Sequence, residues 1–271
     1  MRADVRRAAV LGSPIGHSRS PDLHLAAYRE LGLTGWIYER IECTAEQLPD
    51  VVGGAGPEWV GFSVTMPGKF AALEVASSAT DRARSIGAAN TLVRSGEGWH
   101  ADNTDVDGVS GALTGAGIDP AGQPAVIVGA GGTARPAIVA LAAMGVQSLT
   151  VVARDAGRAQ GVLDLAEQVG LPASVVGFED DALSSLCRAS GVLVSTVPAE
   201  AAAPYVQSLA TAPAILDVIY HPWPTALAEA AQRRGATVVG GLEMLLNQAF
   251  TQVELFTGQP APRAAMAAAL R

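Results

Sequence analysis

Lys69 is the only lysine of the chain, since every other basic residue is an arginine. It ends the segment Val-Thr-Met-Pro-Gly-Lys, which begins at Val64. A guanidinium keeps its proton near neutral pH, whereas an amine can give up a proton and recover it. Either this lysine has escaped the arginine bias by chance, or its position requires an amine that exchanges a proton. The other motifs must decide between the two.

A glycine-rich segment with phosphate-binding spacing occupies residues 129–134. It follows the apolar run Ala125–Val128 and precedes an alanine- and leucine-rich stretch, an order typical of strand, turn and helix. In the pattern G-x-G-x-x-A, the first glycine permits a tight turn, the second lets the backbone approach a pyrophosphate, and the alanine packs closely. A purely structural glycine turn is the alternative. We predict a dinucleotide site at the amino end of the helix, formed by Gly129, Ala130, Gly131, Gly132 and Thr133.

Two arginines follow the next strand candidate, Leu149–Ala153, where such a unit contacts the adenosine ribose. Arg154 and Arg158 favour NADP, because a guanidinium pairs with the 2′-phosphate, whereas a carboxylate at this place favours NAD. Asp155 lies between them and either faces the phosphate or caps the helix that begins near Ala156, and we favour capping. A solvated helix face is the alternative role of the arginines.

Two hydroxyls precede a predicted helix near the start of the chain. Ser18 and Ser20 form a Ser-x-Ser loop before Pro21, which suits the first turn of a helix. Ser20 could be no more than the N-cap of that helix. Two hydroxyls at a helix amino end would also suit a small carboxylate ligand.

Two Asn-Thr pairs, at Asn90 and Asn103, lie beside apolar strand candidates. A lone Asn more often occupies a turn, but we interpret the repeated pairing as a polar pocket. Asp102, Asp105 and Asp107 raise the question of a metal site. Because no glycine-centred calcium loop or terminal Glu follows them, we predict no bound metal.

The order of the elements predicts an α/β protein of two domains. Residues 106–241 alternate strand and helix candidates, which implies a parallel, doubly wound Rossmann sheet for dinucleotide binding. Residues 1–105 form a shorter α/β pattern, which we assign to substrate binding and catalysis. Residues 242–271 are predicted to form helices that return to this first domain. The predicted strands of the Rossmann sheet are 125–128, 149–153, 174–176, 191–197, 214–220 and 237–239.

The composition excludes several classes of protein. The 271 residues are 49% hydrophobic, and the net charge of −8 argues against a nucleic-acid surface. Cys43 and Cys187 fit neither a disulfide framework nor a metal pair, so a reducing cytoplasm fits best. No export signal is visible, and polar residues divide the uncharged run 136–153, so we expect no membrane span.

Several segments, taken in order, resemble the shikimate dehydrogenase family. They cover nearly the whole chain, and together they are more specific than a single glycine turn. The resemblance implies reversible, NADPH-dependent reduction of 3-dehydroshikimate to shikimate, on the route through chorismate to the aromatic amino acids. It implies a small-molecule substrate and NADP, and a homodimer is as compatible with the sequence as a monomer. The segments are Ser-x-Ser-Pro, VTMPGK, GAANT, DNTDVDG, GAGGTAR, the Arg154/Arg158 pair, DVIYHPWPT and GLEMLLNQAF.

The resemblance also implies the role of each site residue. Lys69 and Asp105 would form the catalytic pair. Hydride delivered to a ketone creates an alkoxide that needs a proton, and Lys69 could supply it while Asp105 orients the amine. The substrate residues would be Ser18 and Ser20 at the carboxylate with Thr65 and Tyr220 nearby, and Asn90, Asp105 and Gln248 at the ring hydroxyls. Val218, Gly241 and Met244 would join the cofactor residues on the nicotinamide side.

Three positions depart from the family pattern: Ser63 replaces a usual Asn, Asp155 a frequent Thr, and Glu243 a common glycine. They bear on substrate affinity, on preference for NADP and on the nicotinamide pocket, respectively. A paralogue acting on quinate or an aminated shikimate analogue, with NAD, is one alternative function. A non-catalytic NADP-responsive binding protein is another.

Overall fold

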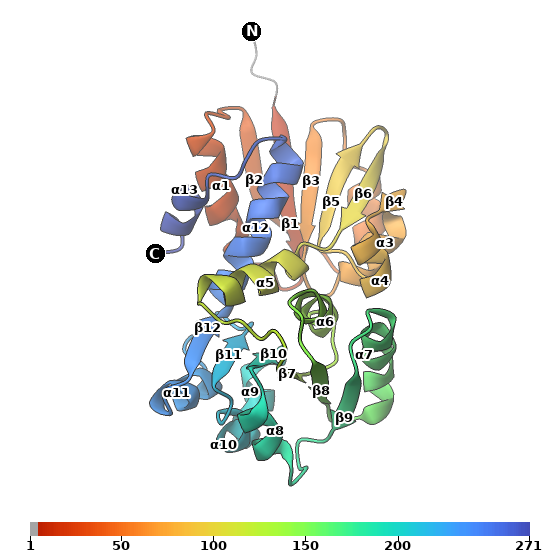
Figure 1. The fold of residues 1–271 in the computed structure, drawn as a ribbon. Helices are drawn as coiled ribbons and strands as arrows, with labels where there is room; N and C mark the ends of the chain where they lie inside the picture. The colour runs from red at the N-terminus through yellow and green to blue at the C-terminus, as the bar shows by residue number, and fades with distance from the viewer. Residues whose placement is uncertain (1–4) are drawn as a thin grey trace. The chain divides into compact units, whose positions relative to one another are not determined.

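The computed structural model describes residues 5–271, except for the side chains of Ala156 and Arg158, and it divides into two compact units. The first unit comprises the chain up to Thr104 together with Leu245–Arg271, and the second comprises Asp105–Met244. The divisions therefore fall after residues 104 and 244, where the sequence analysis placed them after 105 and 241. Figure 1 shows an α/β arrangement in each unit, as the sequence predicted.

The first unit is built on a mixed sheet with the strand order β2-β1-β3-β5-β6-β4. Strand β1 pairs in parallel with β2 and β3, while β5 pairs antiparallel with β3 and β6. The strands are β1 (Arg6–Gly12), β2 (Trp36–Glu42), β3 (Trp59–Val64), β4 (Ser78–Ala79), β5 (Thr91–Ser95) and β6 (Gly98–Asp102).

Helices bury both faces of this sheet. Because side chains alternate along a strand, Ala8 and Val10 of β1 join one apolar core, while Ala9 and Leu11 join the other. The first core contains residues of α1 (Ser20–Glu30), of α13 (Arg263–Ala268) and of α12 (Gly241–Thr257) from Leu245 onward. Residues of α2 (Leu48–Gly53) and α3 (Lys69–Val75) contribute to the second, and α4 (Asp81–Ile86) precedes β5. Residues from Leu245 onward belong to this unit, in which α13 contacts α1.

The second unit holds a parallel sheet with the order β12-β11-β10-β7-β8-β9. The sequence order reverses between β7 and β10, which is the arrangement of a doubly wound Rossmann sheet. The strands are β7 (Pro124–Val128), β8 (Ser148–Val152), β9 (Ala173–Val176), β10 (Val192–Ser195), β11 (Ala214–Asp217) and β12 (Thr237–Gly240).

Helices pack on both faces of this sheet as well. One core takes buried apolar residues of α5 (Asp105–Gly115), α6 (Ala134–Ala143) and α7 (Ala156–Gln168). The other core takes residues of the remaining helices and of η1 (Ala203–Tyr205): α8 (Leu183–Ala189), α9 (Ala199–Ala202), α10 (Val206–Leu209) and α11 (Ala226–Arg233). Among the helices of residues 5–271, none combines the length and the apolar character needed to cross a membrane.

Two predicted strands extend too far at their carboxyl ends. β10 ends at Ser195 rather than at residue 197, and β11 ends at Asp217 rather than at Tyr220. At Asp217 the reason is local, because its Oδ1 accepts a hydrogen bond from the backbone N of Ile219 at 3.2 Å. Such a side-chain bond two residues along turns the chain out of the sheet. Tyr220 therefore lies in the following loop.

Candidate functional site

The glycine turn lies at the carboxyl end of β7 and leads into α6. Gly129 has φ +106°, and a Cβ there would lie 2.6 Å from the Oγ1 of Thr196 and 2.8 Å from a methyl group of Val197. Only glycine fits such a turn. A Cβ at Gly131 would meet nothing within 4 Å, so the backbone faces open space there. Gly132 and Thr133 complete the turn, and α6 begins at the fully buried Ala134, as the fingerprint predicts.

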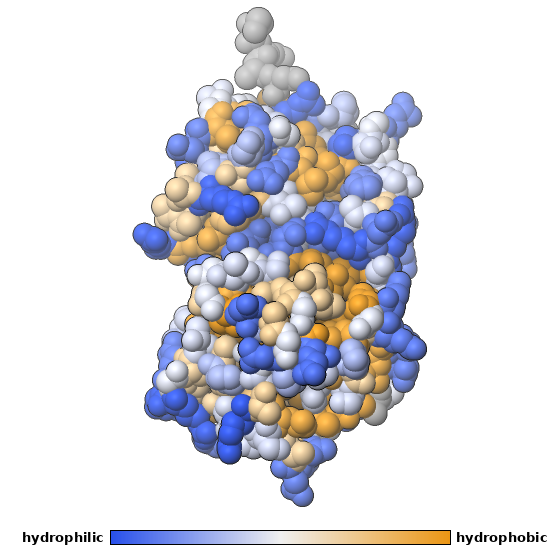
Figure 2. Space-filling model, in the orientation of Figure 1, coloured by the Kyte–Doolittle hydropathy of each residue, from blue (hydrophilic) through white to orange (hydrophobic). Residues whose placement is uncertain are grey.

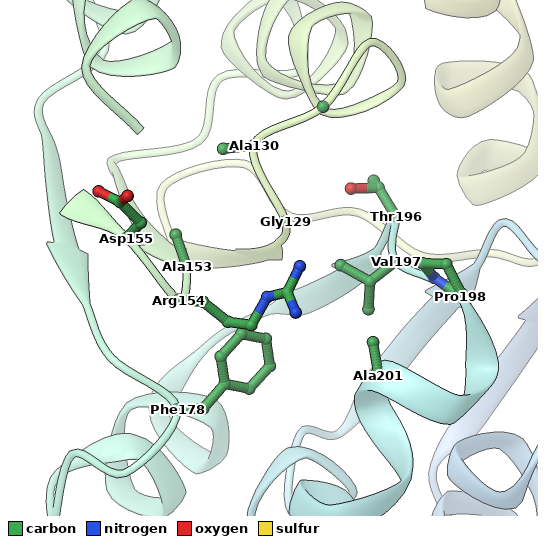
Figure 3. Close-up of a pocket in the computed structure, with 11 residues that line it drawn as sticks. Gly129, Ala130, Ala153, Arg154, Asp155, Phe178, Thr196, Val197, Pro198 and Ala201 are labelled. Carbon is green, nitrogen blue, oxygen red and sulfur yellow. The ribbon is translucent and has the colours of Figure 1, made fainter. Parts of the chain in front are cut away.

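A cavity of about 590 Å³ opens beside this turn, a volume that suits a small-molecule ligand. In Figure 3 the side chain of Arg154 passes the ring of Phe178, and its guanidinium points into the space bordered by Gly129 and Val197. The lining residues come from the turns that follow β7, β8, β9 and β10 and, for Ala201, from α9: Gly129, Ala130, Gly131, Ala153, Arg154, Asp155, Phe178, Thr196, Val197, Pro198 and Ala201. The carboxyl ends of these parallel strands therefore form the cavity, where such sheets bind ligands.

Asp155 acts as a cap for α7. Its Oδ1 accepts a hydrogen bond from the backbone N of Gly157 at 2.8 Å. Figure 3 shows its carboxylate directed away from the guanidinium of Arg154. The capping prediction is confirmed, and the negative charge is turned toward the backbone N–H groups of the helix. The side chain of Arg158 lies outside the described residues.

The ends of β11 and β12 lie close together. A Cβ on Gly241 would lie 2.1 Å from the carbonyl oxygen of Val218, and the N of Gly241 donates to the O of Ile219 at 3.2 Å. Tyr220 and Gly241 line a second cavity, of about 550 Å³, together with Glu243. Val218 and the buried Met244 pack into the core of the second unit.

Burial raises the pKa of Asp217 above its ordinary value, although hydrogen bonds from Thr225 and Ile219 act in the opposite direction. The Oγ1 of Thr225 donates to Asp217 Oδ2 at 2.7 Å and accepts from the N of Ala228 at 3.1 Å, which caps α11. Asp217 thus holds the loop that carries Tyr220.

Ser18 and Ser20 are buried and bonded to each other in the first unit. The Oγ of Ser18 donates to the Oγ of Ser20 at 3.2 Å and accepts from the backbone N of Ser20 at 3.3 Å. Helix α1 begins at Ser20 itself, and its N-cap position is Arg19, so the alternative that Ser20 is only the N-cap is wrong. Arg40 donates from Nε and Nη2 to the carbonyl oxygen of Ser18 at 2.8 and 2.5 Å. The serine pair therefore lies beside a cation and a helix amino end, a favourable setting for a carboxylate.

Asn90 and Gln248 meet in the same unit, although 158 residues separate them. The Nδ2 of Asn90 lies 3.4 Å from the Oε1 of Gln248 and 3.1 Å from the Oγ1 of Thr104. The Oδ1 of Asn90 accepts from the N of Thr104 and from the Oγ1 of Thr91, both at 2.8 Å. The structure thus brings together a buried cluster of amide and hydroxyl groups, as the Asn-Thr pairs predicted for Asn90.

Lys69 is the first residue of α3 and is half-buried. Its carbonyl oxygen accepts a hydrogen bond from the N of Ala89 at 2.8 Å, next to Asn90 in the chain. Thr65 is also half-buried, and its N donates to the O of Leu11, at the end of the strand that leads to the serine loop. Backbone contacts therefore connect the lysine segment to the segments of both polar clusters.

The carboxylate of Asp102 forms hydrogen bonds with other residues of the protein. It accepts hydrogen bonds from Arg82 at 2.7 and 2.6 Å, from Thr80 at 2.7 Å and from the N of Asn103 at 2.7 Å. Burial alone would raise its pKa, but these bonds and the charge of Arg82 lower it below the ordinary value. The Nδ2 of Asn103 donates to the O of Ala88 at 2.9 Å, so this Asn serves the backbone. Asp105 is the buried first residue of α5, in the second unit.

Sequence reasoning missed Phe178, Tyr38 and Gln252. Phe178 lines the cavity beside Arg154 and follows the end of β9, where no sequence motif indicated a binding residue. Gln252 lies one helical turn beyond Gln248, so the spacing of four residues could have identified it. No sequence pattern indicated Tyr38, because its position depends on strand pairing.

Comparison with protein families gives two matches. Residues 10–92 match the shikimate dehydrogenase substrate binding domain, and residues 241–271 match the shikimate 5′-dehydrogenase C-terminal domain.

Several shikimate dehydrogenases are similar to this chain over nearly its whole length. A shikimate dehydrogenase (NADP(+)) of Methylobacterium radiotolerans is 39% identical over 95% of this chain and 93% of its own. The crystal structure of Mycobacterium tuberculosis shikimate dehydrogenase is 57% identical with a TM-score of 0.93, covering 98% of both chains. The Thermus thermophilus shikimate 5-dehydrogenase in complex with NADP(H) and shikimate is 31% identical with a TM-score of 0.83, again covering 98% of both chains.

Proposed function

Since the chain belongs to the shikimate dehydrogenase family, we propose that it reduces 3-dehydroshikimate to shikimate with NADPH, reversibly, on the route to chorismate and the aromatic amino acids. It is an NADP-dependent oxidoreductase. The observation that carries the proposal is that Lys69 lies in the segment that matches the substrate-binding family model, within a chain-long similarity to these enzymes.

The second unit fits a phosphate-bearing dinucleotide. The glycine turn faces open space at Gly131, before the amino end of α6, and Arg154 extends into the cavity beside the turn. We assign the adenosine 2′-phosphate to Arg154 and Arg158, and the pyrophosphate to Gly129, Ala130, Gly131, Gly132 and Thr133. We assign the nicotinamide side to Val218, Gly241 and Met244. When bound, NADPH supplies the hydride.

The substrate groups follow from the chemistry of the polar clusters. We assign the carboxylate to Ser18 and Ser20, supported by the nearby guanidinium of Arg40, with Thr65 and Tyr220 as further contacts. We assign the ring hydroxyls to Asn90, Gln248 and Asp105. A hydroxyl can donate and accept at once, which suits neighbouring amide groups.

In this proposal Lys69 handles the proton of the reaction. As the carbonyl carbon receives hydride, the carbonyl oxygen becomes an alkoxide and takes a proton from the ammonium group of Lys69. In the oxidation of shikimate the amine takes the proton back. Asp105 orients the amine and the substrate hydroxyl, a role that rests on the family resemblance.

The test is initial-rate absorbance at the reduced-nicotinamide band, with shikimate or quinate paired with NADP or NAD. Turnover chiefly with shikimate and NADP is the expected result. Preference for quinate or NAD would favour the paralogue, and cofactor binding without turnover would favour the NADP-responsive binding protein.

Two further expectations complete the proposal. A reducing, cytoplasmic location agrees with the two buried free thiols, Cys43 and Cys187. Light scattering of the purified protein tests the homodimer, which would have twice the mass of one chain.

A further inference from the structure

A continuous line of buried polar side chains runs through the first unit from β2 to α12. Tyr38 Oη donates to Ser63 Oγ at 2.7 Å, and Ser63 Oγ donates to Gln252 Oε1 at 2.8 Å. Gln252 Nε2 then donates to Thr91 Oγ1 at 2.9 Å, and Thr91 Oγ1 donates to Asn90 Oδ1 at 2.8 Å. The line ends at the 3.4 Å contact between Asn90 and Gln248. Each of the six residues is at most 5% exposed.

Backbone groups fix the direction of these hydrogen bonds. A backbone N–H can only donate and a backbone carbonyl can only accept, so each orients the amide that it contacts. The N of Thr104 donates to Asn90 Oδ1. The backbone O of Asn90 accepts from Gln252 Nε2 at 3.3 Å, and the O of Leu245 accepts from Gln248 Nε2 at 2.9 Å. The hydroxyl of Ser63 therefore donates to Gln252 Oε1, and that of Thr91 donates to Asn90 Oδ1 at 2.8 Å, with the Oγ1 of Thr104 as a longer contact at 3.3 Å.

We propose that Gln252 is a positioning residue for substrate binding, an inference that rests on the proposed function. Its amide is the only group of the line that joins the Tyr38–Ser63 half to the Thr91–Asn90 half. It also holds the backbone at Asn90. Through Thr91 and the backbone at Asn90, Gln252 supports the orientation that the N of Thr104 gives to the Asn90 amide, with its NH2 group facing the carbonyl oxygen of Gln248.

This orientation defines what the site accepts. The contact between Asn90 Nδ2 and Gln248 Oε1 is long for a hydrogen bond, so it is the one that a ligand can replace at least cost. A ligand hydroxyl placed there accepts from Asn90 and donates to Gln248. A keto oxygen could not donate to Gln248, so the pair selects a hydroxyl. The arrangement also gives Ser63 a role, because its hydroxyl accepts a hydrogen bond from Tyr38 and donates one to Gln252.

Gln252→Met tests the inference by removing both polar ends at similar length. We expect KM for shikimate to rise about tenfold, as for one lost buried hydrogen bond, with KM for NADP and kcat within about twofold of the parent. Val253→Ala is the matched control, because Val253 is fully buried in the same helix and belongs to the apolar core. It should lower the thermal midpoint and leave KM for shikimate unchanged.

Gln252→Glu adds a readout that a merely structural role would not move. A neutral carboxyl has one donor and one acceptor and can keep the direction of the line, whereas a carboxylate can only accept. The Nε2 of His24 lies 3.3 Å from the Oε1 of Gln252, so the new carboxyl and this imidazole share a proton and titrate as a pair, while burial raises the pKa of Tyr38 well above its usual range. Loss of the shared proton in alkali leaves a carboxylate that can only accept. KM for shikimate, divided by that of the parent, should be near one in mild acid and about tenfold higher in alkali.

The outcomes separate the inference from the function. An unchanged KM for shikimate in Gln252→Met, or an equal rise in Val253→Ala, would overturn the positioning role. A KM ratio of the Gln252→Glu variant that does not change with pH would overturn it as well. Failure of the parent protein to turn over shikimate would overturn the proposed function, and this inference with it.

Discussion

At the scale of single residues, the proposed reaction depends most on the amine of Lys69. Replacement by Met removes the proton donor, so kcat should fall by about 100-fold to 10,000-fold, the usual contribution of a positioned acid or base. The affinity for NADP, measured by fluorescence titration, should stay near that of the parent, because the proposed cofactor residues lie in the second unit. Turnover of Lys69→Met comparable to that of the parent would refute the assigned role.

Two further variants separate charge from proton exchange. Lys69→Arg keeps the positive charge but cannot exchange a proton near neutral pH, so it should be nearly as inactive as Lys69→Met. Arg29→Met removes an exposed cation from α1 in the same unit and should leave kcat unchanged.

Arg154 should decide the choice of cofactor. Arg154→Gln removes the proposed partner of the 2′-phosphate, so KM for NADP should rise about 10-fold to 100-fold while KM for NAD changes little. Arg188→Gln is a suitable control, because Arg188 lines a different cavity of the same unit. Equal effects of Arg154→Gln on both cofactors would contradict the assignment.

Single residues were predicted where a local motif carries the chemistry. Spacing at the ends of strands and helices predicted Gly129, Arg154 and the Ser18/Ser20 pair as binding residues. Tyr38 and Gln252 were not found, because they contact Ser63 through a strand register and a helix packing that no local pattern encodes. Asn103 belonged to a predicted pocket, yet it bonds the backbone of Ala88, since an Asn-Thr pair does not reveal which carbonyl its amide will meet.

At the scale of elements, the turns at the carboxyl ends of the strands of the second unit hold the proposed cofactor residues in place. The apolar runs predicted its six strands because parallel strands are buried on both faces. The predicted end of β11 was wrong because the side chain of Asp217 accepts a hydrogen bond from the backbone N of Ile219. Strand propensity does not include this local competition for the backbone.

Gly241 should be required for stability, since a Cβ there would lie 2.1 Å from a backbone oxygen. Gly241→Ala must push the ends of β11 and β12 apart, which should lower the free energy of unfolding by about 1–3 kcal/mol. Urea titration followed by circular dichroism measures this change. An unchanged midpoint would show that the strand ends can separate freely.

Gly131→Ala should give the opposite pattern. A Cβ there meets nothing within 4 Å, so stability should change by no more than about 0.5 kcal/mol. The methyl group would occupy the space proposed for the pyrophosphate, so KM for NADP should rise. A loss of stability without a change in KM for NADP would contradict the phosphate role of the turn.

At the scale of the whole molecule, one buried imidazole should shape the dependence of stability on pH. Burial lowers the pKa of His24 to about 3, although its hydrogen bond with Gln252 acts in the opposite direction. In the unfolded chain a histidine takes up a proton below about pH 6.5. Between these values the unfolded state binds more protons, so the free energy of unfolding falls on acidification.

The slope attributable to His24 should reach about 1.4 kcal/mol per pH unit between about pH 4 and 6. His24→Phe keeps a ring stacked on Tyr38 but cannot titrate, so its unfolding free energy should change less with pH by that amount. Chemical denaturation at several pH values measures both slopes. Equal slopes for the parent and His24→Phe would mean that His24 binds its proton equally well in the folded and unfolded states, contrary to the prediction.

The central claim is that the chain couples NADPH oxidation to the formation of shikimate. The most direct measurement supplies 3-dehydroshikimate and NADPH to the purified protein and quantifies NADPH loss by absorbance and shikimate by chromatography. We expect one shikimate to form for each NADPH oxidised, with the rate greatly reduced in Lys69→Met. NADPH binding without oxidation, or a reduced product other than shikimate, would contradict it.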